Sequence, residues 1–237
     1  MGQKIRPDSL RLGIVNDWHA RWFAKKSFRT YLQEDVVIRA AVMKRIATAG
    51  VVNIKIERNS SNDCRVTIKA ARPGLIIGRG GKGIEELTAF IEKALTTMRK
   101  KNNLAKGPHS KLKISIEDLK AQDIFSAVIA QNIALDLEKR MPFRRLLKKA
   151  IDTAMQNRDV KGIKVRVSGR LNGSEIARSE SLSKGSLPLQ TLRALIDYAE
   201  ATAFTTYGTI GVKVWLYKGQ VFEDNKPSKE KSGDSEK

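Results

Sequence analysis

The fold of this chain is decided by the stretch ARPGLIIGRGGKG, which occupies residues 71–83. Its second half is a glycine-rich turn with one cation, Gly78-Arg79-Gly80-Gly81, set directly after an apolar run. Glycine has no Cβ and adopts positive φ without penalty, so consecutive backbone N–H groups can face one concavity that holds an anion. Glycine clusters occur in many turns, and the flanking segments therefore decide what this one does.

The flanks predict a complete α+β unit. Residues 33–49 have apolar side chains at helical spacing, and residues 52–56 and 64–68 alternate as half-buried strands. A second helix is predicted from Ile84 to Met98, and residues 111–116 alternate again as a third strand. The order is helix, strand, strand, short helix, glycine turn, helix, strand. This is the arrangement of a type II KH domain, whose G-x-x-G turn clamps an RNA backbone.

The same glycines satisfy other nucleotide motifs, which their surroundings disfavour. Gly78, Gly80 and Gly83 match the G-x-G-x-x-G of dinucleotide-binding folds. That motif needs a full strand before it and an acidic residue about 20 positions after it, and neither is present. A Walker loop fails because Gly83 follows Lys82 where Ser or Thr is required. The RNA clamp is favoured, and a purely structural turn is its alternative.

Composition points to a polyanionic partner. The 237 residues include 45 Lys and Arg against 25 Asp and Glu, a net charge of +20, while 41% are hydrophobic. Such a chain has enough apolar residues for folded domains and, by length, for two of them. No apolar run approaches the roughly 18 residues of a membrane span, and the N-terminus lacks a signal-peptide core, so we expect a cytosolic protein.

A second unit follows residue 117. Apolar side chains recur every four residues from Phe125 to Leu137, and another amphipathic helix is predicted after Pro142. The second helix gathers cations on its polar surface, and like charges at i,i+4 cost an isolated helix roughly 0.2–0.5 kcal/mol per pair. We therefore favour contact with RNA over the alternative of a solvated face. The cations are Arg144, Arg145, Lys148 and Lys149.

The rest of this unit predicts strands. Residues 163–167 alternate, Asn172-Gly173 predicts a tight hairpin, and a return strand is expected over residues 175–182. A final strand is expected over residues 212–216. Residues 192–206 are ambiguous, because their apolar spacing is helical while their composition favours a strand; periodicity alone predicts a helix.

These patterns divide the chain into four parts. We expect an N-terminal arm over residues 1–30, a KH domain over 31–117, an α/β domain over 118–222 and a disordered tail over 223–237. The arm mixes cations with aromatic side chains and is a poor core former, so we expect it to be ordered only against a partner. Cys64 lies at an inward strand position and is expected to be a buried hydrophobe.

The sequence offers few candidates for a catalytic or metal-binding residue. His19 and His109, the only histidines, have no companion at metal-ligand spacing, and Cys64 lacks a thiolate-stabilising neighbour. We expect no catalytic residue, no metal and no cofactor.

Beyond these patterns, the chain resembles bacterial small-subunit ribosomal protein three over almost its whole length. Several long motifs occur in the right order, which makes the resemblance specific. The matching stretches are MGQKI at 1–5, RLGIV at 11–15, RWFA at 21–24, ARPGLIIG at 71–78, KGIKV at 161–165, SGRL at 168–171, EIAR at 175–178, TTYG at 205–208 and IGVKVW at 210–215.

The resemblance implies a fold and a function. It implies an α+β chain with an N-terminal type II KH domain, then a two-layer α/β domain with an antiparallel sheet, in which residues 192–206 are largely extended. It implies a non-enzymatic protein of the small-subunit head that binds ribosomal RNA and messenger RNA and contacts head proteins ten and fourteen. No membrane or second copy of the chain is expected as a partner. The alternatives are a free KH-type RNA chaperone and a nucleotide-dependent nucleic-acid enzyme.

The resemblance also implies site residues. Those implied to line the messenger entry tunnel are Arg144, Arg145 and Lys148. Those implied to bind ribosomal RNA are Arg72, Gly78, Arg79, Gly80, Gly81, Lys82, Lys164, Arg170 and Arg178. Gly80 stands where the family commonly has a cation, so fewer ionic contacts are expected there, with Lys82 as the substitute.

Overall fold

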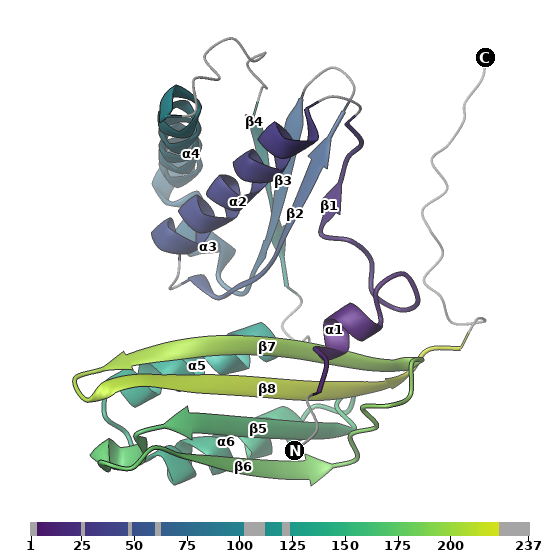
Figure 1. The fold of residues 1–237 in the computed structure, drawn as a ribbon, viewed down its shortest axis with the longest axis vertical. Helices are drawn as coiled ribbons and strands as arrows, with labels where there is room; N and C mark the ends of the chain where they lie inside the picture. Colours follow the sequence, from purple (N-terminus) through teal and green to yellow (C-terminus); the bar gives the residue numbers. More distant parts are fainter. Residues whose placement is uncertain are drawn as a thin grey trace.

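The computed structural model contains two α/β units, each built on a four-stranded sheet (Figure 1). It describes residues 4–24, 27–46, 49–59, 63–101, 112–119 and 124–222. The expected tail and His109 therefore lie outside the described residues. No helix in these ranges is long and apolar enough to span a membrane.

The N-terminal unit has the KH order that the glycine-turn flanks predict. Its sheet is ordered β1-β2-β3-β4, with β2 and β3 antiparallel and β3 and β4 parallel. Apolar residues of α2, α4 and the sheet, among them Val42, Ile91 and Ile68, form one buried core. The elements are α2 (Phe28–Arg45), β2 (Val51–Arg58), β3 (Cys64–Ala70), α3 (Pro73–Ile77), α4 (Lys82–Lys101) and β4 (Leu112–Asp118).

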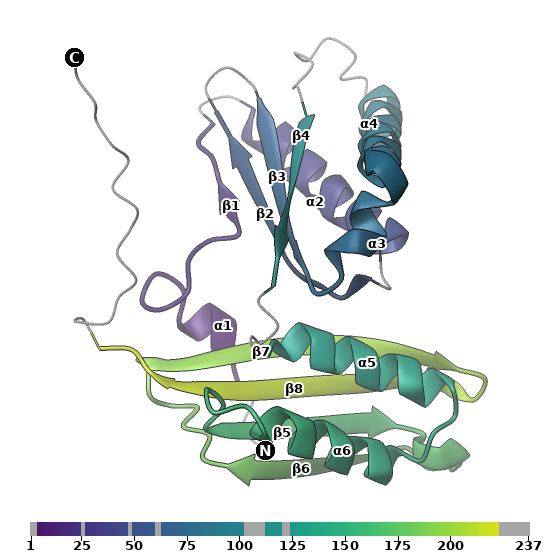
Figure 2. The same ribbon diagram turned by 180° about the vertical axis from the view of Figure 1, so that it is seen from behind.

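The C-terminal unit is a two-layer sandwich. Its strands are ordered β6-β5-β8-β7 and all neighbours are antiparallel. Both helices cover one face of the sheet, as Figure 2 shows, and their apolar stripes complete the core. The predicted fold class is thus confirmed. The elements are α5 (Ser126–Glu138), α6 (Phe143–Met155), β5 (Gly162–Gly169), β6 (Arg178–Gly185), β7 (Ala194–Thr205) and β8 (Gly208–Gln220).

In this unit the helix that periodicity alone predicts and the tight hairpin are wrong, whereas the extended segment that the resemblance implies is confirmed. Residues 194–205 form strand β7, as the family resemblance implies and the helical spacing does not. Alternate alanines, such as Ala199 and Ala203, contact the helix-covered core, and pairing along β8 satisfies the backbone. The Asn172-Gly173 pair lies in a short 3-10 turn with Asn172 at φ 55°, and the return strand begins only at Arg178. The connection is therefore longer than a two-residue hairpin.

The N-terminal arm packs on both units of its own chain, whereas the sequence predicts that it is ordered only against a partner. Helix α1 (Pro7–Leu10) lies against β7, and β1 (Ala20–Arg21) pairs in parallel with β2 (Figure 1). The Arg11 side chain is fully buried and donates to four backbone carbonyl oxygens. Our expectation of an arm without a place in the chain's own fold is thus corrected.

A buried ion cluster connects three elements of the KH unit. Arg58 of β2 donates to Glu34 Oε2 at 2.7 Å and to Asp35 Oδ1 at 2.6 Å, both on α2. Arg99 of α4 donates to Glu34 Oε1 at 2.7 Å, and the Trp22 indole of the arm donates to Asp35 Oδ2 at 2.8 Å. Nearby, Cys64 is buried as predicted, and burial raises the pKa of its thiol to about 11.

Candidate nucleic-acid interface

The glycine turn has the geometry of an anion cradle. Gly78 leaves α3 at φ 68° and ψ −178°, and a single 3-10 turn, Arg79–Gly81, follows before α4. Within that turn Gly80 is left-handed, at φ 64° and ψ 24°. A left-handed residue that follows a right-handed one turns successive N–H groups toward one concavity, and the start of α4 adds its positive dipole end. The turn therefore offers backbone donors to a phosphate.

The glycines of this stretch serve two different purposes. A Cβ built on Gly80 or Gly81 would meet no atom within 4 Å, so these positions leave room for a ligand and need glycine for their positive φ. A Cβ on Gly83 would lie 2.4 Å from the carbonyl oxygen of Ile76. Gly83 thus lets α4 start directly against α3, which gives a structural reason for the apparent G-x-G-x-x-G pattern.

Gly83→Ala is expected to destabilise the protein by about 1–3 kcal/mol, because the added methyl group forces α3 and α4 apart. The matched control is Gly74→Ala in α3, where a Cβ meets nothing within 4 Å and alanine favours the helix. Urea unfolding of both variants measures the difference. Equal stability of the two variants would show that the α3–α4 contact is not tight.

Exposed apolar side chains flank the turn. Leu75 is 60% exposed and Ile77 38% exposed, whereas Ile76 between them is 2% exposed and packs in the core. Lys82 is also exposed, directly after the glycines. Apolar surface beside backbone donors suits an unstacked base next to its phosphate.

The cations of α6 are less free than the sequence indicates. Arg144 donates from Nε and Nη2 to the two carboxylate oxygens of Glu180 on β6, both at 3.1 Å. This pairing lowers the pKa of the Glu180 carboxyl and raises the pKa of Arg144. Arg145 and Lys148 are exposed and have no ion-pair partner among the described residues. An anion facing α6 was expected, and for Arg144 the chain itself supplies one.

The remaining predicted RNA-binding residues of the C-terminal unit do not form one patch. Lys164 lies on the sheet face without helices, with Nζ 5.8 Å from the Trp215 ring centre. Arg170 donates to the carbonyl oxygens of Ser174 and Tyr207, so it holds two loops of its own chain together. Arg178 lies 3.4 Å from Glu180 and therefore joins the Arg144 cluster.

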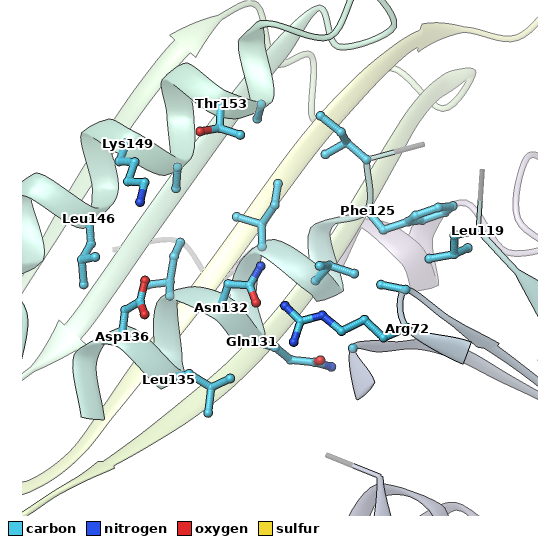
Figure 3. A pocket seen from close by; sticks show the side chains of 18 of the residues that line it. Arg72, Leu119, Phe125, Gln131, Asn132, Leu135, Asp136, Leu146, Lys149 and Thr153 are labelled. Carbon is cyan, nitrogen blue, oxygen red and sulfur yellow. The ribbon is translucent and has the colours of Figure 1, made fainter. Parts of the chain in front are cut away.

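Arg72, which is predicted to bind ribosomal RNA, lies in a position that the sequence does not indicate. It lines a cavity of about 640 Å³ between the KH unit and helices α5 and α6, and Figure 3 shows its guanidinium beside Gln131 and Asn132. The sequence does not predict this cavity, which we call the groove, and it does not predict that the Glu180 carboxylate pairs with Arg144. Neither leaves a local signal, because both arise from segments far apart in the chain.

No group of three His, Cys, Asp or Glu side chains in the described ranges could hold a metal.

Family models match both units. Residues 37–139 match the model described as KH domain. Residues 133–216 match the model described as Ribosomal protein S3, C-terminal domain.

Relatives match the chain nearly end to end. The small ribosomal subunit protein uS3 of Finegoldia magna is 47% identical, with 100% of this chain and 93% of the relative covered. The uS3 protein of Clostridium kluyveri is 47% identical, with 98% of each chain covered. That of Bacillus cytotoxicus is 45% identical, with 98% of this chain and 100% of the relative covered.

Proposed function

The chain belongs to the family of small ribosomal subunit protein uS3, and from this premise we propose that it binds ribosomal RNA in the subunit head and helps position and unwind messenger RNA at the entry tunnel. Its role is that of a structural ribosomal protein with an RNA-binding KH domain. The proposed neighbours are head proteins ten and fourteen, in a cytoplasmic ribosome, and the proposed action needs no catalysis.

The observation that carries this proposal is the glycine turn. Its left-handed Gly80, its open approach and the adjoining start of α4 together form a site for a backbone phosphate. The apolar Leu75 and Ile77 beside it suit the bases on either side. We propose that ribosomal RNA contacts the glycine turn. Further proposed contacts are Arg72, Lys82, Lys164, Arg170 and Arg178.

The messenger is assigned to α6. Arg145 and Lys148 are exposed, and Arg144 remains 70% exposed although it is paired with Glu180. An exposed ion pair is screened by solvent and contributes little to stability, so Arg144 can exchange Glu180 for a messenger phosphate. We also propose the domain division that the sequence predicts, with residues 31–117 as the KH domain and 118–222 as the second domain.

Arg79→Asp with Gly80→Asp is expected to weaken RNA binding by the full chain at least tenfold, because two carboxylates replace the anion-binding surface. A matched control is Lys93→Asp with Thr96→Asp, which makes the same charge change on an exposed part of α4. Filter binding to small-subunit RNA fragments at fixed salt measures both. Equal losses of affinity in the two variants would mean that RNA binding depends on the overall positive charge and not on the glycine turn.

Cosedimentation with small subunits at high salt provides the companion measurement. A structural ribosomal protein stays with the subunit after the wash. An RNA chaperone that acts off the ribosome would be released, and that result would count against the proposal.

Removal of the three α6 cations as Arg144→Ala, Arg145→Ala and Lys148→Ala is expected to lower the salt slope of single-strand binding by about 2, since each phosphate contact contributes roughly 0.7. The helix keeps its buried face, which includes Phe143, Leu147 and Ile151. The variant should assemble into small subunits and translate a structured message more slowly. An unstructured message is the internal control; equal slowing of both, or failed assembly, contradicts the guide role.

A further inference from the structure

The groove between the two units is a second candidate site, separate from the clamp and from the exposed α6 cations. Its floor consists of apolar side chains of α5 and α6 and the residues before them, including Phe125, Val128 and Ala150. Its rim combines Arg72 from the KH unit with polar side chains of both helices (Figure 3). A volume of about 640 Å³ lies within the usual range for small-molecule ligand sites.

The rim carries uncompensated positive charge. Asp136 is the acidic residue among those lining the groove, and Lys139 lies 3.6 Å from it. Arg72 and Lys149 are exposed, and neither has an ion-pair partner among the described residues. An anionic group is therefore the complementary ligand for this rim.

A buried amide oxygen also lacks a donor. Gln131 donates from Nε2 to the Val51 carbonyl oxygen at 3.0 Å, a bond that links α5 to the KH unit and holds the amide in place. Its Oε1 is buried and accepts no hydrogen bond within the described residues. A buried acceptor without a partner is costly, so the Nε2 bond to Val51 is the contact that holds this amide in the wall of the groove.

We propose that the groove binds one unpaired nucleotide of an RNA strand. The base lies on the apolar floor and the phosphates lie toward Arg72 and Lys149. No other ligand class meets both features, the apolar floor and the cationic rim, as directly: an apolar peptide leaves the cations unpaired, and inorganic phosphate leaves the floor uncovered. The inference rests on the proposed RNA-binding function and adds a site to it.

The position of Arg72 gives the groove a route to the clamp. Arg72 immediately precedes α3, and the glycine turn immediately follows that five-residue helix. A strand held at the glycine turn therefore has only α3 to pass before it reaches the groove. Lys149 stands beside Lys148 in the sequence, which brings the far end of the groove to the α6 cations.

The test uses the full chain and a single RNA strand of about 12 nucleotides that carries the photo-crosslinker 4-thiouridine. Ala150→Phe fills the groove, and Arg72→Ala with Lys149→Ala removes the rim cations. The matched control, Lys184→Ala with Lys213→Ala, removes two exposed cations elsewhere that are already paired with Asp152 and Glu200. Thermal melting confirms that each variant is folded.

We expect crosslinks to α5 and α6 peptides in the wild-type chain and the control. Ala150→Phe should lose them and bind about tenfold more weakly, the effect of one lost base stack. The rim variant should show a salt slope lower by about 1.4, two contacts at roughly 0.7 each.

Wild-type affinity in both groove variants, with binding lost in the clamp variant, would overturn this inference and leave the proposed function intact. The same holds if Ala150→Phe binds RNA normally but cannot assemble, because the groove would then receive a protein segment. If the clamp variant also binds like the wild type, the proposed function fails with it.

Discussion

Arg58→Ala is expected to destabilise the protein by about 3–5 kcal/mol, enough to unfold a marginally stable KH unit. The substitution leaves the carboxylates of Glu34 and Asp35 without their shared partner, and the three side chains are only 5%, 3% and 6% exposed. Removal of one member of a buried ion cluster is costly because the remaining charge stays desolvated. Arg99 still pairs with Glu34, so the main loss falls on Asp35.

Arg45→Ala is the matched control. Arg45 also pairs with a glutamate from another helix, Glu86, at 2.8 Å, but those side chains are 54% and 62% exposed. Loss of this exposed pair should cost less than about 1 kcal/mol. Urea unfolding followed by circular dichroism measures both variants. A cost below 1 kcal/mol for Arg58→Ala would mean that the cluster does not hold the KH unit together.

Arg11→Ala is expected to cost about 3 kcal/mol and to release α1 from the C-terminal unit. The buried guanidinium donates to the carbonyl oxygens of Ala194 at 2.7 Å and of Leu189 and Thr191 at 2.9 Å. It also donates to Pro7 within α1 at 3.1 Å. Hydrogen bonds from charged donors contribute roughly 1.5–3 kcal/mol, and buried carbonyls left without a donor add to the loss.

Two controls separate charge from geometry at this position. Arg11→Lys keeps the charge but cannot reproduce the planar fork of donors, so most of the loss should remain. Arg6→Ala removes an exposed cation that pairs with Glu200 and lies over the Tyr198 ring, and it should cost much less than Arg11→Ala because these contacts are open to solvent. Amide exchange at residues 7–11 is the readout. Unchanged protection there in Arg11→Ala would show that other contacts hold the arm.

These arm contacts help to set the relative positions of the surfaces that we propose to bind RNA. Residues 7–11 are attached to the C-terminal unit, and residues 20–21 extend the KH sheet. Together with the Gln131–Val51 hydrogen bond, they set the orientation of the clamp relative to α6. Contacts within the chain therefore arrange the glycine turn, the groove and the α6 cations relative to one another.

The sequence by itself determined the KH order, the glycine turn and the apolar stripes of α5 and α6. Each depends on neighbours within a few residues: glycine adopts the left-handed turn at Gly80 without penalty, and the periodicity of apolar residues indicates which helix face is buried. Where local signals conflicted, as in residues 194–205, the spacing of apolar residues was misleading, because long pairing with β8 outweighs intrinsic preference.

Only the tertiary structure decided which charges are available. The pairing of Arg144 with Glu180, 36 residues away, and the placement of Arg72 against α5 depend on contacts between distant segments. The same holds for Arg11, which meets carbonyls more than 170 residues further along the chain. The sequence shows where each cation stands in the chain. Which group it pairs with depends on how whole helices and strands pack, and no local pattern predicts that packing.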